Sequence, residues 1–142
     1  MKTVRNILQY KSQSIYSVDP DTSVLDALKI MMDKNISALL VMEGSELKGI
    51  FTERDYARKI ILQGKSSKET KIKEVMTASL EVINLNSSID YCMQIMTDKH
   101  IRHLPIVDNG KVSGMISIGD LVKFVINDQK QTIEQLQSYI SS

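Results

Sequence analysis

The residues best suited to chemistry form one pattern that occurs twice. Thr52 and Ser117 each end an apolar run, and each is followed three residues later by an aspartate, Asp55 or Asp120. One interpretation is a capping box, in which hydroxyl and carboxylate satisfy free backbone amides at a helix start. The other is binding, because a helix N-terminus accepts phosphate and a carboxylate one turn later can hold a ribose diol. The duplication favours binding and predicts a nucleotide site.

This pattern belongs to a longer internal repeat. At an offset of 65 residues the chain matches itself without a gap from Thr22 to Ile60. Neither copy can bury its apolar face alone, so we expect the two copies to pack about a pseudo-two-fold axis. The clefts between them are then paired candidate sites.

The elements that must position these residues follow one order in each copy, β-α-β-β-α. The expected fold class is therefore α/β of the α+β kind, with two such repeats and a C-terminal helix. In the first copy we expect strands at Ile15–Val18, Ala38–Met42 and Leu47–Thr52. The apolar faces of its two helices are predicted to hold Val24, Ala27, Leu28, Met31 and Met32, and then Tyr56, Ala57, Ile60 and Ile61.

The second copy repeats the order. We expect strands at Leu80–Ile83, Leu104–Val107 and Val112–Ser117. One helix carries Ile89, Cys92, Met93 and Met96 on its apolar face, and another begins at Gly119. The methionines on these faces indicate core packing and not a soft-metal site.

The repeat predicts the domain boundaries. Residues 1–62 form the first repeat with its N-terminal segment, 63–71 a polar, lysine-rich linker, and 72–127 the second repeat. The linker composition is typical of a solvated loop and makes it a candidate hinge. Residues 128–142 form a tail helix, whose apolar stripe of Ile126, Ile133, Leu136 and Ile140 is expected to dock on the module or on a partner chain.

Bulk composition narrows the function. The 142 residues carry a formal charge of +1, which gives no field for recruiting nucleic acid or an anionic membrane. No stretch approaches the length of a membrane span, and the N-terminus does not resemble a secretion signal. Cys92 is the only cysteine, which excludes an intramolecular disulfide and favours a reducing compartment. We expect a cytoplasmic protein.

Other chemistries have weak support. His100 and His103 with Cys92 could be metal ligands, but the His-x-x-His spacing has no third ligand nearby in sequence. A Cys-His nucleophilic pair is disfavoured because Cys92 falls on the helix face expected to be buried. No complete catalytic constellation is present. We therefore expect no metal, no catalytic cofactor and no enzymatic activity.

At this point the chain resembles a known family. The resemblance rests on the segments Gly49–Asp55 and Gly114–Asp120 and on the run Lys99–Val107, and it covers about residues 4–127. These resemble tandem CBS domains, the two-copy unit called a Bateman module. The resemblance implies two repeats packed through their sheets, with AMP, ADP, ATP, NAD or S-adenosylmethionine in the clefts. It also implies a disc-shaped homodimer formed through the helices of the pair.

Carried over by position, the resemblance implies two unequal sites. In the first, Asp120 holds the ribose and Ser117 the phosphate, Arg102 and His103 add positive charge, and the adenine lies against Ile36, Ser37 and Tyr16. In the second, Asp55, Thr52 and Arg54 take these roles, with Ile101 and Arg102 on the facing strand.

The two sites differ in charge. Arg102 is matched by Ser37, His103 by Ala38 and Arg54 by Gly119, so we do not expect equal affinity, because charge-assisted bonds to phosphate are stronger than neutral ones. An exposed strand edge is the competing interpretation of Arg102 and His103.

The expected function is therefore regulatory. The chain is interpreted as a stand-alone sensor that binds an adenine nucleotide, AMP above all, and passes the result on by a change of shape. Two alternatives stay open: an interaction module with empty clefts, or a detached regulatory region of an enzyme such as IMP dehydrogenase, which carries a CBS pair in that family.

Overall fold

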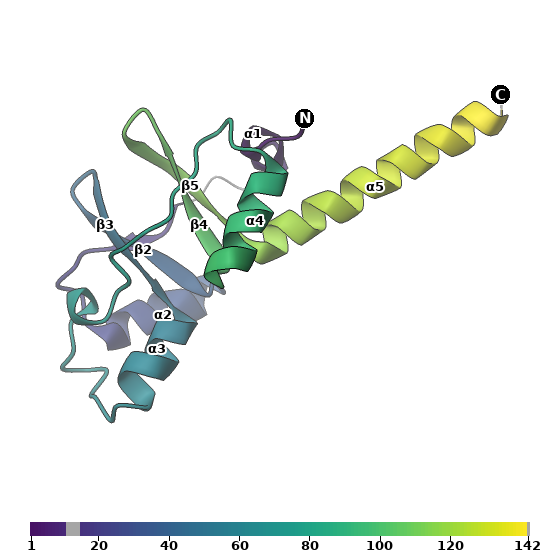
Figure 1. Cartoon of the computed structure of the whole chain (residues 1–142). Coiled ribbons are helices and arrows are strands. Elements are labelled where there is room, and N and C mark those ends of the chain that lie inside the picture. The colour runs from purple at the N-terminus through teal and green to yellow at the C-terminus, as the bar shows by residue number, and fades with distance from the viewer. Residues whose placement is uncertain (11–14, 142) are drawn as a thin grey trace.

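The computed structural model describes residues 1–10 and 15–141, and its two repeats each contain a small sheet with helices beside it (Figure 1). The first repeat contains α1 (Val4–Leu8), β1 (Ser17–Val18), α2 (Val24–Lys34), β2 (Ala38–Glu43), β3 (Glu46–Thr52), α3 (Glu53–Tyr56) and the π-helical turn η1 (Ala57–Ile61). The second contains the 3₁₀ turn η2 (Ile72–Glu74), α4 (Ile89–Lys99), β4 (His103–Asp108), β5 (Lys111–Ser117) and α5 (Ile118–Ser141). The predicted mixed fold of two repeats and a C-terminal helix is confirmed.

The two hairpins have the same register. Ala38 lies opposite Thr52 in β2–β3, and His103 lies opposite Ser117 in β4–β5. Each hairpin also has an irregularity at the same repeat position, after Val41 and after Ile106. This shared register brings the first residue of one strand beside the hydroxyl residue that starts the following helix.

The strand expected at Leu80–Ile83 is wrong in extent. Only Ile83 forms a bridge, parallel to Ile106, with backbone bonds to Pro105 and Val107 of 3.0 and 2.7 Å. Ile83 is 3% exposed whereas Val82 is 44% exposed, so a single residue of the run enters the core. The strand expected at Ile15–Val18 is similarly short, because β1 pairs only Ser17 and Val18 with β2.

The helices α2 and α4 start and stop alike. Ser23 and Ser88 cap their N-termini, and Asn35 and His100 end them in the left-handed conformation with φ of 54°. Met32 was expected on the buried face of α2 and is 81% exposed, because it lies about 100° around the helix from buried Met31.

The second helix of the first repeat differs from the expectation. Ile60 is 1% exposed, but Ala57 and Ile61 are exposed. After Tyr56 the helix widens into η1, where the Leu62 amide donates to the Ala57 carbonyl five residues earlier. The side chains therefore do not follow the α-helical spacing on which the prediction rested.

The repeats exchange their N-terminal segments. Val4 and Ile7 of α1 are buried in the core of the second repeat, and the Val4 amide donates to the Ser87 carbonyl at 2.9 Å. Ile72 and Val75 are buried in the core of the first repeat, and the Ile72 amide donates to the Thr22 carbonyl at 2.8 Å. Ile7 and Ile72 are 65 residues apart, so the exchange obeys the internal symmetry.

The segment expected to be a solvated linker is partly docked. Ser67 and Thr70 accept backbone hydrogen bonds of 2.9 Å from Leu25 and Val24 at the start of α2, and Thr70 is 7% exposed. Just beyond it, Lys73 forms an ion pair of 2.9 Å with Asp21 and thereby lowers the pKa of that carboxyl. The lysine side chains of this segment face solvent, whereas its backbone is hydrogen-bonded to the start of α2.

The tail is not a separate helix. It continues the second-repeat helix without a break as α5, which extends away from the rest of the chain (Figure 1). The side chains of Ile133, Leu136 and Ile140 are 54, 57 and 80% exposed. The tail stripe therefore does not dock on this chain's own module, which leaves the partner-chain alternative.

Candidate functional site

One cleft of about 360 Å³ lies between the repeats and is lined from both sides. The first repeat contributes Tyr16 just before β1, and Ile36 and Ser37 between α2 and β2, together with Ile15, Asn35, Ala38 and Leu40. The second repeat contributes His103, Met115, Ile116, Ser117 and Asp120. Six of the eleven residues expected at the two sites thus line one cavity.

A polar contact crosses this cleft. The Ser37 Oγ lies 3.0 Å from the His103 Nε2, and the direction of this hydrogen bond depends on the histidine tautomer. His103 is held in place by its pairing with Ser117 across β4 and β5. The contact therefore connects the two repeats at His103, which lies opposite Ser117, the residue before α5.

Both S/T-x-x-D segments form capping boxes. In the first repeat the Asp55 amide donates to Thr52 Oγ1 at 3.1 Å, and the Thr52 amide donates to Asp55 Oδ2 at 3.0 Å. In the second the Asp120 amide donates to Ser117 Oγ at 3.1 Å, and the Ser117 amide donates to Asp120 Oδ2 at 2.8 Å. Capping is therefore present at both positions, and what distinguishes them is the surroundings of each carboxylate.

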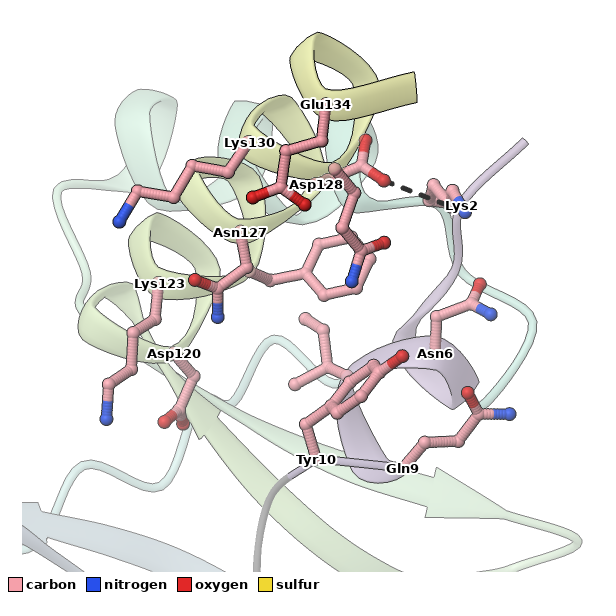
Figure 2. A pocket seen from close by; sticks show the side chains of 13 residues that line it. Lys2, Asn6, Gln9, Tyr10, Asp120, Lys123, Asn127, Asp128, Lys130 and Glu134 are labelled. Carbon is pink, nitrogen blue, oxygen red and sulfur yellow. Dashed lines mark ion pairs between the residues drawn. The ribbon is translucent and has the colours of Figure 1, made fainter. Parts of the chain in front are cut away.

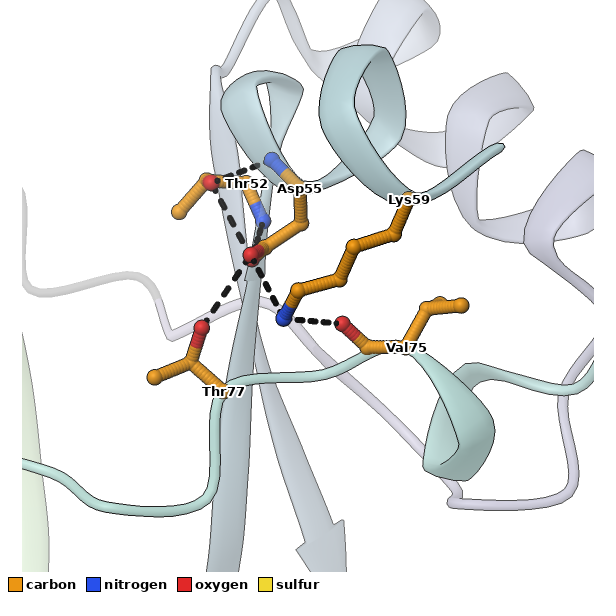
Figure 3. A network of polar contacts seen from close by, with 5 residues as sticks. All are labelled: Thr52, Asp55, Lys59, Val75 and Thr77. Atoms are coloured by element: carbon orange, nitrogen blue, oxygen red, sulfur yellow. Dashed lines mark hydrogen bonds and ion pairs between the residues drawn. The ribbon is translucent and has the colours of Figure 1, made fainter. Parts of the chain in front are cut away.

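The Asp55 carboxylate belongs to a closed polar network (Figure 3). Its Oδ1 accepts from Thr77 Oγ1 at 3.1 Å and pairs with Lys59 Nζ at 3.1 Å, and Lys59 also donates to the Val75 carbonyl at 2.8 Å. Asp55 is 7% exposed and is one of two polar residues buried in the described chain. Every direction around this carboxylate is already used by protein donors.

The Asp120 carboxylate has different neighbours. The residue four positions later is Phe124, where the first repeat has Lys59, so this position supplies a ring and not an ammonium group. Asp120 is partly exposed and lines both the cleft between the repeats and a second cavity, between α1 and α5. This is the position from which a carboxylate can reach a bound molecule.

The remaining expected residues lie outside the cleft. Arg54 is exposed and its Nη1 donates to the His100 carbonyl at 2.7 Å, which ties α3 to the end of α4. Arg102 is exposed, and its carbonyl accepts from the Ile118 amide at 2.9 Å. Ile101 packs against the core of the second repeat. Thr52 lies in the Asp55 network.

Sequence reasoning missed several residues that decide the site. Lys59 carried a signal, since it follows Asp55 by four residues and can pair with it on a helix. Asn35 lines the cleft at the left-handed end of α2, a place that asparagine tolerates well. Thr77 gave no local signal, because it meets Asp55 only through the fold.

The single cysteine is not in the environment of an activated nucleophile. The Cys92 thiol is fully buried, and burial raises its pKa to about 11, so it is a poor nucleophile at neutral pH. Among residues 1–10 and 15–141, no three or more His, Cys, Asp or Glu side chains are placed to hold a metal ion. In the same residues no helix is both long and apolar enough to cross a membrane.

Comparison with known proteins agrees with this architecture. The chain is 38% identical over 148 residues to the CBS domain-containing protein CBSX3, mitochondrial, of Arabidopsis thaliana, covering 97% of this chain and 71% of the relative. It is 36% identical to the CBS domain-containing protein YhcV of Bacillus subtilis over 107 residues, which cover 75% of this chain and 76% of the relative.

Solved structures are similar as well. A candidate signal-transduction protein with CBS domains from Burkholderia ambifaria superposes with a TM-score of 0.87 at 50% identity, covering 90% of this chain and 96% of that one. The CBS domain pair of protein MJ0100, in complex with 5′-methylthioadenosine and S-adenosyl-L-methionine, gives a TM-score of 0.79 at 26% identity and covers 90% and 98%. The CBS domain family matches residues 4–62 and again 72–127, so the chain belongs to this family and is a tandem CBS pair.

Proposed function

We propose that this CBS pair is a regulatory sensor, without catalytic activity, that binds an adenosine-containing nucleotide in the cleft between its repeats. One observation carries the proposal: Tyr16, Ile36 and Ser37 line the same cleft as Ser117 and Asp120. An apolar wall for a base and a hydroxyl–carboxylate pair for a phosphorylated sugar thus face each other, as a small-molecule pocket requires.

Each group has a role set by its chemistry. Asp120 accepts from the ribose hydroxyls, while Ser117 and the positive end of the long helix α5 bind phosphate. His103, already at the cleft, adds a donor. The exposed Arg102, its neighbour in sequence, adds positive charge that attracts phosphate. The adenine lies against Ile36 and Ser37 near Tyr16.

The Asp55 position is proposed as the weaker site. A ribose bound by Asp55, with Thr52 and Arg54 on the phosphate and Ile101 nearby, must displace Lys59 and Thr77 from a buried carboxylate. Removing such partners costs the desolvation of each group left unpaired, typically about 1–3 kcal/mol. The free energy of binding at that position is reduced accordingly.

The ligand class is supported by the MJ0100 pair, which binds two adenosine compounds. We propose AMP as the mononucleotide that the cleft accepts, with ADP, ATP or NAD as variants that keep the same adenosine. Isothermal titration calorimetry of the full chain with each nucleotide, and with S-adenosylmethionine, tests the class. A ligand at about a hundred times its dissociation constant also stabilises the fold by about 2.7 kcal/mol, which a thermal melt detects.

The Asp120→Asn variant tests the role of the carboxylate. It keeps an acceptor for the helix cap but weakens the ribose contact, so we expect at least about tenfold weaker binding, the cost of one charge-assisted bond. Arg58→Ala, at an exposed position away from the cleft, is the matched control. If Asp120→Asn melts early but binds as before, the ribose role is misassigned.

Two rival functions predict other outcomes. An interaction module with empty clefts gives no thermal shift with any nucleotide. A detached regulatory region of an enzyme such as IMP dehydrogenase binds nucleotides but acts on a catalytic domain of another polypeptide.

Self-association is proposed through α5. Five of its exposed apolar residues follow alternating steps of four and three, and Gln129 occupies the single polar position in this heptad stripe of Val122, Ile126, Gln129, Ile133, Leu136 and Ile140. Such a seam is self-complementary, and one polar seam residue fixes register between two parallel copies. A hexameric CBS-CP12 protein, 25% identical, is a structural neighbour. We propose a homodimer, with the other helices of the pair extending the contact.

Light scattering of the eluting protein tests this dimer. Ile133→Asp places a charge in the seam and should yield monomers, whereas Ser138→Asp on the opposite side of the helix should leave dimers intact. A monomeric native chain, or a dimer indifferent to Ile133→Asp, contradicts the seam.

The proposed location is the cytoplasm, supported by the free, buried Cys92. A relative carries "mitochondrial" in its name, so organelle fractionation or its bacterial equivalent is the relevant test.

A further inference from the structure

Two aliphatic side chains at the end of η1 face solvent. Ile61 and Leu62 are 62 and 78% exposed, whereas the preceding Ile60 is buried in the core of the first repeat. This end of the molecule, beyond α3, lies away from the projecting part of α5 (Figure 1). The helix seam proposed for self-association therefore leaves it uncovered.

The backbone around these side chains is held in place. The Lys65 amide donates to the Ile60 carbonyl at 3.0 Å, and Gly64 has a φ of 65°, the left-handed conformation that commonly ends a helix. The loop that follows is attached to α2, because the Leu25 amide donates to the Ser67 carbonyl at 2.9 Å. A surface that is ordered before binding loses less conformational entropy when a partner arrives.

Cationic side chains flank the two aliphatic residues. Arg58, Lys65 and Lys68 are exposed, and none of them forms an ion pair or a side-chain hydrogen bond with a residue that the structure describes. Lys59 differs, since it pairs with Asp55 at 3.1 Å. Three positive charges at this end of the molecule are therefore available to an external anion.

The segment is basic although the whole chain is nearly neutral. Residues 56–68 contain four basic and no acidic side chains, so subtracting their charge from the formal +1 leaves −3 for the rest of the chain. The equivalent residues 121–133 are mixed in charge, because Lys123 and Lys130 line the cavity between α1 and α5 together with Asp128 (Figure 2). The concentration of positive charge is therefore specific to the first repeat and is not a property of the repeated fold.

The combination of groups selects among anionic partners. Nucleic-acid binding combines cations with aromatic rings that stack on bases, and residues 56–68 contain one aromatic side chain, the half-buried Tyr56. An anionic bilayer is a broad surface that would also meet the exposed Glu53 and Glu69 on either side of the segment. A polypeptide is narrow enough to contact the cations and leave these glutamates in water.

We infer that the exposed side chains of this segment form a docking surface for an acidic segment of another protein, in which apolar residues are flanked by aspartate or glutamate. This surface, the basic patch, consists of Arg58, Ile61, Leu62, Lys65 and Lys68. The apolar residues of the partner cover the two aliphatic side chains, and its carboxylates pair with the three cations. The inference does not depend on the nucleotide, because no residue of the basic patch lines the cleft between the repeats.

Fluorescence anisotropy with a labelled synthetic peptide tests the basic patch. The peptide has two leucines flanked on each side by three glutamates, and a second peptide has lysines in place of the glutamates. The acidic peptide should bind the full chain, more weakly as salt is added, and the basic peptide should not bind. Arg58→Ala/Lys65→Ala/Lys68→Ala should weaken binding about tenfold, the combined effect of three exposed ion pairs. Ile61→Ser/Leu62→Ser should weaken it by about tenfold or more, because less apolar area is buried.

Two matched controls change similar side chains elsewhere. Lys111→Ala/Lys123→Ala/Lys130→Ala removes three exposed lysines from the second repeat, and Val82→Ser replaces another exposed aliphatic side chain. Both controls should bind the acidic peptide as the wild-type chain does. Thermal melts of all variants verify that they are folded.

Other occupants of the basic patch give different results. Equal binding of the two peptides, or binding of the acidic peptide that neither patch variant weakens, overturns the inference. Patch-dependent binding to phosphatidylserine vesicles or to a DNA duplex, without binding of the acidic peptide, replaces the protein partner with a lipid or a nucleic acid. Dimers that dissociate in Ile61→Ser/Leu62→Ser assign the patch to self-association. Nucleotide affinity should be the same in every patch variant, so failure of the docking surface and failure of the nucleotide sensor are distinguishable.

Discussion

The first and second repeats contain the same hydroxyl–x–x–aspartate cap, yet one carboxylate is enclosed and the other borders two cavities. The difference lies in what surrounds each cap. Lys59 and Thr77 bind Asp55, whereas Phe124 stands at the position of Lys59 in the second repeat. A motif shared by two repeats therefore fixes local backbone geometry, and the neighbours decide whether the carboxylate is a structural or a ligand-binding group.

The prediction with the largest expected effect concerns the exchange of N-terminal segments between the repeats. Ile7→Ala and Ile72→Ala each remove a buried side chain and should each reduce the free energy of unfolding by about 3 kcal/mol. Hydrogen exchange should show that Ile7→Ala loosens the second repeat and Ile72→Ala the first, although each residue belongs to the other repeat in sequence. Loosening confined to the residue's own repeat would contradict the exchange.

The two aspartates provide the next test. Asp55→Asn leaves Lys59 beside a neutral group and weakens the contacts of Thr52 and Thr77, so we expect a loss of about 2 kcal/mol in urea unfolding. The loss is below that of a fully buried pair because Lys59 is 37% exposed. Asp120→Asn should cost less than about 1 kcal/mol, since capping persists. Equal losses in the free energy of unfolding would mean that the two carboxylates contribute equally to stability.

Two glycines at equivalent positions of the repeats, Gly49 and Gly114, differ in how closely other residues pack against them. A Cβ at Gly49 would lie 2.7 Å from the Met76 Sδ and 2.9 Å from the Thr77 carbonyl, because the segment after η2 crosses β3 there. A Cβ at Gly114 meets only Ile106 Cδ1, at 3.7 Å. Gly49→Ala should therefore lower stability by about 1–2 kcal/mol, and Gly114→Ala should leave it unchanged or slightly raised. Thermal melts of both variants decide the matter.

The smallest expected effect concerns Cys92, which occupies the position of Ala27. Cys92→Ala should cost about 1 kcal/mol at pH 7. The folded thiol has its pKa raised from 9.0 to about 11, so the unfolded chain ionises first as the pH rises. Stability from this residue is complete below pH 9 and is lost between pH 9 and 11.

The pH dependence has a direct control. The free energy of unfolding of the wild-type chain should fall over that alkaline range by more than that of Cys92→Ala, because only the wild-type chain has a thiol to ionise. Iodoacetamide should label the thiol far more slowly in buffer than in urea. Rapid labelling of the native chain would show that Cys92 is accessible.

The errors of sequence reasoning have particular causes. Met32 carries an apolar side chain at a position where the second repeat has Thr97, and this mismatch between copies was a usable warning that it faces solvent. Of the strand expected at Leu80–Ile83, only one bridge forms. The apolar content of this run does not indicate which of its residues pair with a neighbouring strand. Ile61 was misplaced because nothing in the local pattern specifies a π-helical turn.

The sequence by itself determined the repeat, the order of elements, the helix caps and the family, because periodicity and capping are local properties that recur at a fixed offset. Only the tertiary structure decided which N-terminal segment completes which core, that Thr77 meets Asp55, and that Asp120 borders two cavities. These depend on contacts between residues far apart in the chain, whose geometry is set by packing and not by local propensity.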